Sequence, residues 1–163
     1  MSISTIRSLF KLTASARNMT TIVSLPRMSA KTLSEKILAE RDVKDSTFAI
    51  IDVRDDDYIG GHIKGATNVP SHQLDAMMPT LVRRLREKKV VVFHCMLSQI
   101  RGPKSALAYV RHRDGLLISM GESVPEGQTV YVLTDGFQGW QQTYGEDERL
   151  TEGYVKDLWT GLD

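Results

Sequence analysis

Short runs of β-branched and aromatic residues alternate along the chain with longer segments in which apolar residues recur every three or four positions. The first pattern predicts buried strands, and the second predicts amphipathic helices. Strands are expected at 21–25, 47–53, 66–69, 90–93 and 128–133, and helices at 29–41, at 71–87, after residue 102 and after residue 135. Because strands that alternate with helices pair in parallel, we expect a three-layer α/β domain with a mostly parallel central sheet flanked by helices.

The same spacing gives each of the first three helices a buried face. The buried positions are Leu33, Ile37 and Leu38, then Leu74, Met78, Leu81 and Leu85, then Ala106, Leu107 and Val110. Residues 55–58 predict a short turn of helix, and the Gly-, Ser- and Glu-rich segment 113–127 predicts an irregular surface loop. The late aromatic residues Tyr154 and Trp159 are expected to dock the tail on the body of the domain.

Length and charge restrict the class of protein. A chain of 163 residues suits a single core, and its formal net charge of +1 makes no case for nucleic-acid binding. No uncharged run in the sequence is long enough to cross a bilayer, so no membrane association is expected. One cysteine excludes an internal disulfide framework and predicts a reducing compartment. We expect a monomer without a metal site.

The first residues differ from the rest, because no Asp or Glu precedes Glu35 while several Lys and Arg residues do. Residues 1–18 are rich in Ser, Thr and Ala, a composition typical of a mitochondrial presequence. The alternatives are a disordered leader without import function and translation that begins at Met19. We expect residues 19–163 to form one domain in the cytoplasm or nucleus, or in the mitochondrion if residues 1–18 direct import.

The only cysteine, Cys95, comes directly after a predicted buried strand and shortly before a predicted helix. A strand, a loop and a helix in that order direct successive backbone N–H groups and the helix N-terminus toward one point, where a tetrahedral oxyanion binds. Arg101 adds a planar fork for two of the anion's oxygens. The thiolate of Cys95 then attacks a bound phosphate or arsenate, so the segment predicts an enzyme.

A lone cysteine after a hydrophobic run is more often a small buried residue without chemistry. Three neighbours favour catalysis here, because Pro103 suits a first helical turn, Gly102 allows close backbone approach, and Arg101 needs an anion at a helix start. His94 is open to two interpretations. It is either a satisfied polar core residue or a neighbour that tunes the cysteine.

Three groups of residues resemble the rhodanese superfamily. They are Ile51-Asp52-Val53-Arg54 with Tyr58, Gly61-His62-Ile63, Gly65-Ala66 and Val69-Pro70, then Val130-Tyr131-Val132-Leu133 with Gly136-Phe137 and Trp140, and the loop His94-Cys95-x5-Arg101-Gly102-Pro103. The loop and the tail from Tyr144 to Trp159 are similar to the branch that contains the mitotic-inducer dual-specificity phosphatases and the small fungal and plant arsenate reductases.

The resemblance implies a rhodanese-like domain in which Cys95 is the nucleophile and Arg101 binds the oxyanion. The backbone that cradles the anion is then Met96, Leu97, Ser98, Gln99, Ile100 and Arg101. The resemblance also implies structural roles for Asp52, Arg54 and His62, in a hydrogen-bond scaffold at the rim of the sheet. True sulfurtransferases of the superfamily have a loop one residue shorter, so this loop favours phosphate or arsenate over persulfide transfer.

One departure from the resemblance concerns the proton donor. The mitotic inducers have acidic residues within the loop where this chain has Met96 and Ile100, so a loop acid is missing. Without general-acid help, alkyl leaving groups suffer more than aryl ones. Asp135 is a candidate acid after a neighbouring strand, but a helix cap is the preferred interpretation of this residue.

Two enzyme hypotheses and two remote ones follow. The preferred function is a cysteine-dependent phosphatase of the protein tyrosine or dual-specificity type, without a cofactor, which acts through a phosphocysteine on a phosphorylated protein. The alternative is an arsenate reductase on a small oxyanion, with glutathione and glutaredoxin as external reductants because the chain has no second cysteine. A thiosulfate sulfurtransferase and a non-catalytic phosphate-binding module are the remote alternatives.

Overall fold

The computed structural model describes residues 19–161, so the predicted leader 1–18 lies outside the described residues. The central sheet has five parallel strands in the order β1-β6-β5-β2-β4. Their bounds are β1 Arg27–Met28, β6 Thr129–Leu133, β5 Val90–His94, β2 Phe48–Asp52 and β4 Thr67–Asn68. Four of the five expected strands are therefore confirmed to within one or two residues at each end.

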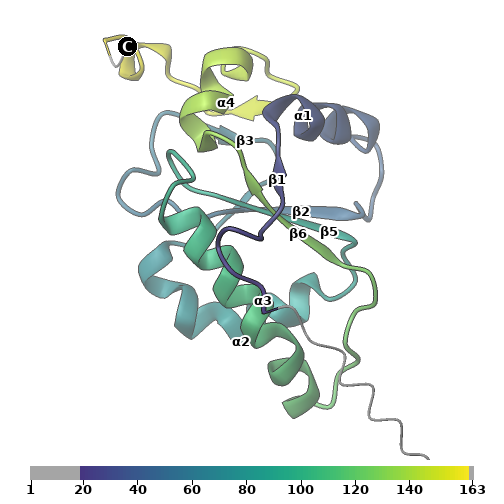
Figure 1. Ribbon diagram of the computed structural model, residues 1–163. Helices are drawn as coiled ribbons and strands as arrows, with labels where there is room; N and C mark the ends of the chain where they lie inside the picture. The colour runs from purple at the N-terminus through teal and green to yellow at the C-terminus, as the bar shows by residue number, and fades with distance from the viewer. Residues whose placement is uncertain (1–18, 162–163) are drawn as a thin grey trace, which may run out of the picture.

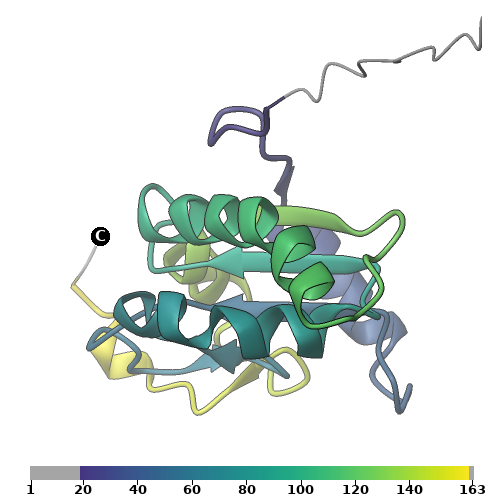
Figure 2. The same ribbon diagram turned by 90° about the horizontal axis from the view of Figure 1, so that it is seen from below.

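Helices cover both faces of this sheet (Figure 1). The helices α1 (Ala30–Ala39) and α4 (Gly136–Tyr144) lie on one face, and α2 (Leu74–Leu85) and α3 (Arg101–Ser119) lie on the other. Figure 2 shows α2 and α3 side by side in front of the strands. The predicted three-layer α/β architecture is confirmed. No helix within residues 19–161 combines the length and the apolar character that a membrane span requires.

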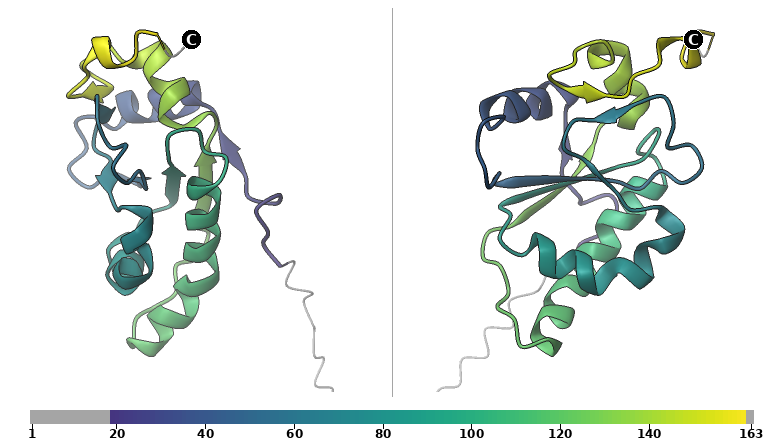
Figure 3. Two further views of the ribbon diagram at one scale, coloured as in Figure 1. Left: turned by 90° about the vertical axis from the view of Figure 1, so that its left-hand side faces the viewer. Right: turned by 180° about the vertical axis from the view of Figure 1, so that it is seen from behind.

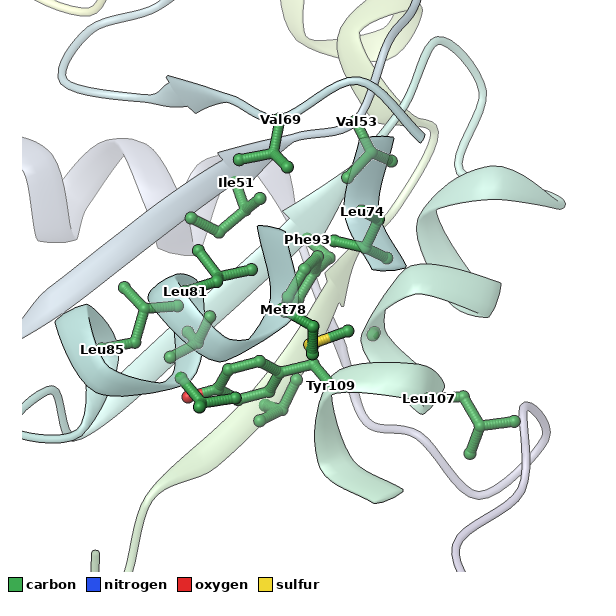
Figure 4. Close-up of a cluster of buried hydrophobic side chains, with 14 of the residues drawn as sticks. Ile51, Val53, Val69, Leu74, Met78, Leu81, Leu85, Phe93, Leu107 and Tyr109 are labelled. Atoms are coloured by element: carbon green, nitrogen blue, oxygen red, sulfur yellow. The ribbon is translucent and has the colours of Figure 1, made fainter. Parts of the chain in front are cut away.

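Side-chain alternation along the strands divides the core in two. Ile50 and Val92 face α1 and α4, whereas Ile51 and Phe93 face α2 and α3. Figure 4 shows this second cluster, in which side chains of the sheet point toward one face of α2 and toward Tyr109 of α3. The predicted buried positions of α2 are confirmed as Leu74, Met78, Leu81 and Leu85.

The expected strand at 21–25 is wrong, because β1 begins only at Arg27. Residues 21–25 form a turn in which the carbonyl oxygen of Thr21 accepts hydrogen bonds from the N–H groups of Ser24 and Leu25. The hydroxyl of Ser24 also accepts a bond from the N–H group of Thr21 at 2.8 Å. Local bonds from Ser and Thr side chains compete with strand pairing, and here they prevail.

The expected loop at 113–127 is also wrong over its first half, because α3 continues to Ser119. Leu117 is fully buried in the core between α2, α3 and the sheet, and this burial outweighs the helix-breaking tendency of Gly115. After Ser119 and Met120, Gly121 has a left-handed φ of +73°, which caps the C-terminus of the helix. The N–H groups of Gly121 and Glu122 donate to the carbonyls of Ile118 and Leu117, as in a Schellman motif.

The other segments depart less from expectation. Residues 55–58 form one hydrogen-bonded turn, and the segment 71–87 begins with the 3-10 turn η1 (Ser71–Gln73) before α2. Ser29 caps α1 by accepting a hydrogen bond from the N–H group of Thr32 at 3.1 Å. A two-stranded antiparallel sheet of β3 (His62–Ile63) and β7 (Thr151–Glu152) was not predicted.

The C-terminal tail docks through Trp159, as expected. It runs through η2 (Lys156–Leu158) on the side of the sheet that carries α4, away from α2 and α3 (Figure 3). The indole N–H of Trp159 donates to the carbonyl of Gly60 at 2.9 Å, and its ring meets Phe137 edge-on at 5.4 Å. The tail therefore joins the turn before β3 to the start of α4.

Candidate active site

Cys95 is the first residue after β5, the middle strand of the sheet. The loop of residues 95–100 turns back into α3 where β5 ends (Figure 1). All five strands are parallel, so this loop lies at the carboxyl edge of the sheet, where α/β folds hold their ligands. The loop of Cys95 therefore follows a buried strand and precedes a helix, as the sequence pattern predicts.

The backbone N–H groups of this loop are available to a ligand. No group within residues 19–161 accepts a hydrogen bond from the N–H groups of residues 95–100. Ile100 occupies the N-cap position of α3 and provides no side-chain cap, so the first turn of that helix also has unsatisfied donors. Unsatisfied N–H groups along a loop and a helix start attract an anion.

The loop encloses a small cavity beside the thiol of Cys95. Its volume is about 150 Å³, and its lining residues are Cys95, Met96, Leu97, Gln99, Ile100 and Arg101. This volume corresponds to roughly five water molecules, which suits a single tetrahedral oxyanion and excludes a drug-sized ligand. A larger cavity of about 460 Å³ lies between α1 and β2, and neither Cys95 nor Arg101 lines it.

Ser98 is the one member of the predicted cradle that does not line the cavity. Its side chain is fully buried, and its hydroxyl has no hydrogen-bond partner. Its φ of +52° lies in the left-handed region, which is unfavourable for a residue with a side chain. The carbonyl of Ser98 accepts a hydrogen bond from Nη1 of Arg27 at 3.1 Å, so β1 holds the middle of the loop.

The first residues of α4 form hydrogen bonds to the backbone of the loop. The N–H groups of Phe137 and Gln138 donate to the carbonyls of Cys95 and Met96 at 3.0 and 2.9 Å. Gly136 makes this contact possible, since a Cβ there would lie 2.5 Å from the carbonyl oxygen of Met96. Carbonyl oxygens that point toward α4 leave the N–H groups of the same peptides to face the other way.

Arg101 lies at the rim of the cavity and forms ion pairs with two carboxylates. Its Nη1 and Nη2 donate to the two carboxylate oxygens of Asp57 at 2.7 and 2.6 Å, and Nη1 also donates to Asp55 at 3.2 Å. We call Asp55 and Asp57 the carboxylate clamp. The hydrogen bonds to Asp57 raise the pKa of Arg101, and the charge of Cys95 adds to this effect, so the thiol and the guanidinium are within electrostatic reach.

Both carboxylates of the clamp are ionised. Hydrogen bonds from Arg101 lower the pKa of Asp57 more than burial raises it. Burial raises the pKa of Asp55, but hydrogen bonds from Ser71, His72 and Arg101 together hold it well below its ordinary value. The acidic side chains that contact Arg101 therefore carry no proton to give to a leaving group at neutral pH.

His94 belongs to the core rather than to the cavity. Its ring is fully buried and stacks on Phe137, and burial lowers its pKa, so it is neutral. Nδ1 lies 3.1 Å from the carbonyl of Cys95, while Nε2 has no partner and is 3.6 Å from Asp52. A neutral ring that donates from Nδ1 fits this geometry. His94 thus acts on Cys95 through the backbone.

Two residues of the expected scaffold, Asp52 and Arg54, contact each other, and the third, His62, pairs elsewhere. Asp52 and Arg54 form a fully buried ion pair with Nη2 2.7 Å from Oδ2, and Arg54 also donates to the carbonyl of Gly61 at 2.9 Å. The guanidinium lies over the ring of Phe137 at 4.1 Å. His62 faces the other way and pairs with Glu152 across β3 and β7 at 2.9 Å.

Asp135 occupies the N-cap position of α4, as the preferred interpretation requires, but its side chain makes no capping hydrogen bond. Its φ of +60° is left-handed, which departs from the extended backbone of an N-cap. It does not line the cavity of Cys95 either. The structure therefore gives no support for Asp135 as the proton donor.

The clamp and Gly136 were missed at the sequence level. A signal for the clamp exists, because Asp55, Asp56 and Asp57 follow β2, which is the parallel neighbour of β5. Carboxylates after one strand and an arginine after the next are brought to the same edge of a sheet. No group of three or more His, Cys, Asp or Glu side chains within residues 19–161 could hold a metal ion.

Comparison with known proteins gives one family. The profile of the rhodanese-like domain matches residues 29–143. The chain is 39% identical to the CDC25-like phosphatase YCH1 of Saccharomyces cerevisiae over 69% of this chain and 78% of that protein. It is 32% identical to arsenate reductase 2.2 of Oryza sativa subsp. japonica over 61% of this chain and 73% of that protein.

A solved structure agrees with these relatives. The fold matches Ygr203w, described as a yeast protein tyrosine phosphatase of the rhodanese family, with a TM-score of 0.68 and 32% identity. The match covers 83% of this chain and 96% of that one. Both the phosphatases and the arsenate reductases of the sequence analysis are therefore among the relatives.

Proposed function

The chain belongs to the rhodanese-like domain family, and from this premise we propose that it is a cysteine-dependent phosphatase of aryl phosphates such as phosphotyrosine. One observation carries the proposal. The thiol of Cys95 and the guanidinium of Arg101 line a cavity the size of one oxyanion, inside a loop whose N–H groups have no partner in the described part of the chain.

The reaction has two steps. The Cys95 thiolate attacks the phosphorus atom, the bond to the leaving oxygen breaks, and that oxygen departs with its electron pair. A water molecule then attacks the phosphocysteine, which releases inorganic phosphate and restores the thiolate. In both steps the loop N–H groups and Arg101 stabilise the charge on the three phosphoryl oxygens that do not react.

The substrate preference follows from the lack of an acid. Asp55 and Asp57 are kept ionised, and loop positions Met96 and Ile100 have no acidic group. Phenolate leaves without a proton, whereas an alkoxide does not. Leu97 and Ile100 are 48% and 72% exposed at the cavity's edge, so an aromatic substrate meets apolar surface there.

The test compares the wild type with Cys95→Ser on para-nitrophenyl phosphate, phosphotyrosine peptide and phosphoserine peptide. The serine hydroxyl is not ionised near neutral pH, so turnover should vanish while the thermal unfolding midpoint stays nearly unchanged. The wild type should prefer both aryl substrates by about two orders of magnitude or more. Hydrolysis by Cys95→Ser, or equal rates on the two peptides, would contradict the proposal.

A second candidate function is arsenate reduction, favoured by the single cysteine and by the rice relative. Cys95 would bond to arsenic with loss of one oxygen as water. Reduction of As(V) to As(III) then takes two electrons, which two external thiols supply as they become a disulfide. Glutathione and a glutaredoxin are the proposed reductant and partner. Arsenate reduction by the purified chain without added thiol would rule this route out.

A further inference from the structure

The guanidinium of Arg101 has five N–H donors, and the clamp uses three of them. Asp57 accepts one bond each from Nη1 and Nη2, which fills the end of the planar group. Asp55 accepts from Nη1 at 3.2 Å. Nε and the second hydrogen of Nη2 have no hydrogen-bond partner within residues 19–161. The free donors lie along one edge and point the same way, which is the bidentate geometry that an oxyanion needs.

The clamp is itself held in place. Oδ1 of Asp57 accepts a hydrogen bond from the N–H group of Asp55 at 3.0 Å. Asp55 accepts bonds from the hydroxyl of Ser71 at 2.6 Å and from Nδ1 of His72 at 2.8 Å. The chain after β2 and the start of η1 thus fix two carboxylates around a flexible arginine side chain. Because the clamp has already oriented the side chain of Arg101, less side-chain entropy is lost when an anion binds.

We propose that Asp57 and Asp55 are positioning residues that present the Nε–Nη2 edge of Arg101 to the oxyanion, an inference that rests on the proposed function. The clamp fills the donors that face away from the substrate and leaves the bidentate edge free. Neither carboxylate touches the reacting atoms. They act on the reaction by orienting Arg101. This orientation stabilises the transition state more than the ground state, because the phosphoryl charge is most widely spread over the oxygens in the transition state.

The opposite reading of the same contacts is competition. Two carboxylates on Arg101 would then act as substitutes for the oxyanion, and removal of either would strengthen anion binding. Removing a negative charge near an anion site also has this effect by electrostatics alone. The direction of the change in affinity therefore separates positioning from competition.

The experiment measures orthovanadate and inorganic phosphate as inhibitors, together with kcat and KM for para-nitrophenyl phosphate. Orthovanadate stands for the transition state and phosphate for the ground state. Asp57→Asn should bind orthovanadate about 10-fold or more weakly and lose a similar factor in kcat, while its KM and its phosphate affinity change less than about 3-fold. The matched control is Asp56→Asn, since Asp56 is exposed and makes no contact with Arg101.

A second variant keeps the charge of the clamp. Ser71→Ala removes the 2.6 Å bond that fixes Asp55 and leaves both carboxylates in place. Positioning predicts a smaller loss in the same direction, about 3-fold in orthovanadate affinity, whereas electrostatics alone predicts none. Tighter or unchanged orthovanadate binding by Asp57→Asn would overturn the inference. Wild-type protein without Cys95-dependent orthovanadate binding would instead overturn the proposed function.

Discussion

Two aspartates at the end of β2 and just after it, Asp52 and Asp57, each pair with an arginine, and the two pairs have different roles. Arg54 and Asp52 are fully buried, and Arg54 lies over the rings of Phe137 and Tyr58 at 4.1 and 4.9 Å. Arg101 and Asp57 are each about one-third exposed, at 32% and 34%. Both pairs are bidentate, and their shortest N–O distances are 2.7 and 2.6 Å. Distance alone therefore does not tell a structural pair from a functional one.

Burial and spare donors make the difference. The free N–H group of the buried pair, Nη1 of Arg54, faces protein and has no partner, so nothing from solution reaches it. Arg101, in contrast, is partly exposed and lines the cavity beside Cys95. A buried pair is costly to break because it leaves an unpaired charge, whereas a half-exposed pair contributes little to stability and remains available to a ligand.

The largest expected effect is on stability at the buried pair. Arg54→Met leaves the buried Asp52 carboxylate without its charged partner and with the backbone N–H of residue 54 as a donor, so the free energy of unfolding should fall by about 3 to 5 kcal/mol. Urea denaturation followed by circular dichroism measures this change. The double variant Asp52→Asn/Arg54→Met removes both charges and should recover a large part of the loss. A single variant as stable as the wild type would contradict the structural role.

The next effect is on turnover at the exposed pair. Arg101→Lys should lower kcat/KM for para-nitrophenyl phosphate by about 10²- to 10³-fold, because an ammonium has no bidentate edge. Its free energy of unfolding should stay within about 1 kcal/mol of the wild type. Near-normal turnover in this variant would mean that Arg101 does not bind the oxyanion.

A smaller effect concerns acid. The pKa values of Asp55 and Asp57 are lowered in the folded protein, so their stabilisation is present above the unfolded carboxyl pKa and is lost as pH falls through the folded values. The unfolding midpoint of Asp55→Asn/Asp57→Asn should lie below that of the wild type by a constant amount from pH 5 to 8. This gap should begin to narrow as pH falls below the ordinary carboxyl pKa of about 4, and it should close only as pH passes the lowered folded values. A gap that is as large at pH 2 as at pH 7 would contradict this titration.

The smallest effect belongs to a third contact, the hydrogen bond between His62 and Glu152, whose side chains are 28% and 45% exposed. Glu152→Gln should lower the free energy of unfolding by less than about 1 kcal/mol, as for other exposed pairs. Thermal unfolding at pH 7 measures it. A loss as large as that of Arg54→Met would show that exposure does not rank these pairs.

Much of the fold follows from local pattern. The strands β2, β5 and β6 are found within a residue or two because they combine β-branched residues with mostly buried positions, and the face of α2 follows from its spacing. The strand predicted at 21–25 is wrong because short polar side chains form a turn there. The loop predicted at 113–127 is partly wrong because tertiary packing extends α3 into this polar segment. The first failure arises from local side-chain hydrogen bonds that the hydrophobic pattern does not register, and the second arises from tertiary packing that no local window contains.

The candidate site is predictable in part for the same reason. Cys95 and Arg101 belong to one contiguous loop, so their spacing indicates that they share a site. The clamp comes from a segment more than forty positions away in the chain, and its partnership with Arg101 appears only once β2 lies beside β5. Gly136 is further removed, because its lack of a side chain matters only when α4 meets the loop.

The docking of the tail also gives the protein a built-in optical probe. The sequence has two tryptophans, and Trp140 is fully buried against Tyr144. Trp159 contacts the ring of Phe137 edge-on. The N–H group of Phe137 donates a hydrogen bond to the carbonyl of Cys95. The indole of Trp159 is thus two contacts from the nucleophile and outside the cavity. We therefore expect the fluorescence emission of Trp159 to change when an anion occupies the loop, which would report binding without a label or a chromogenic substrate.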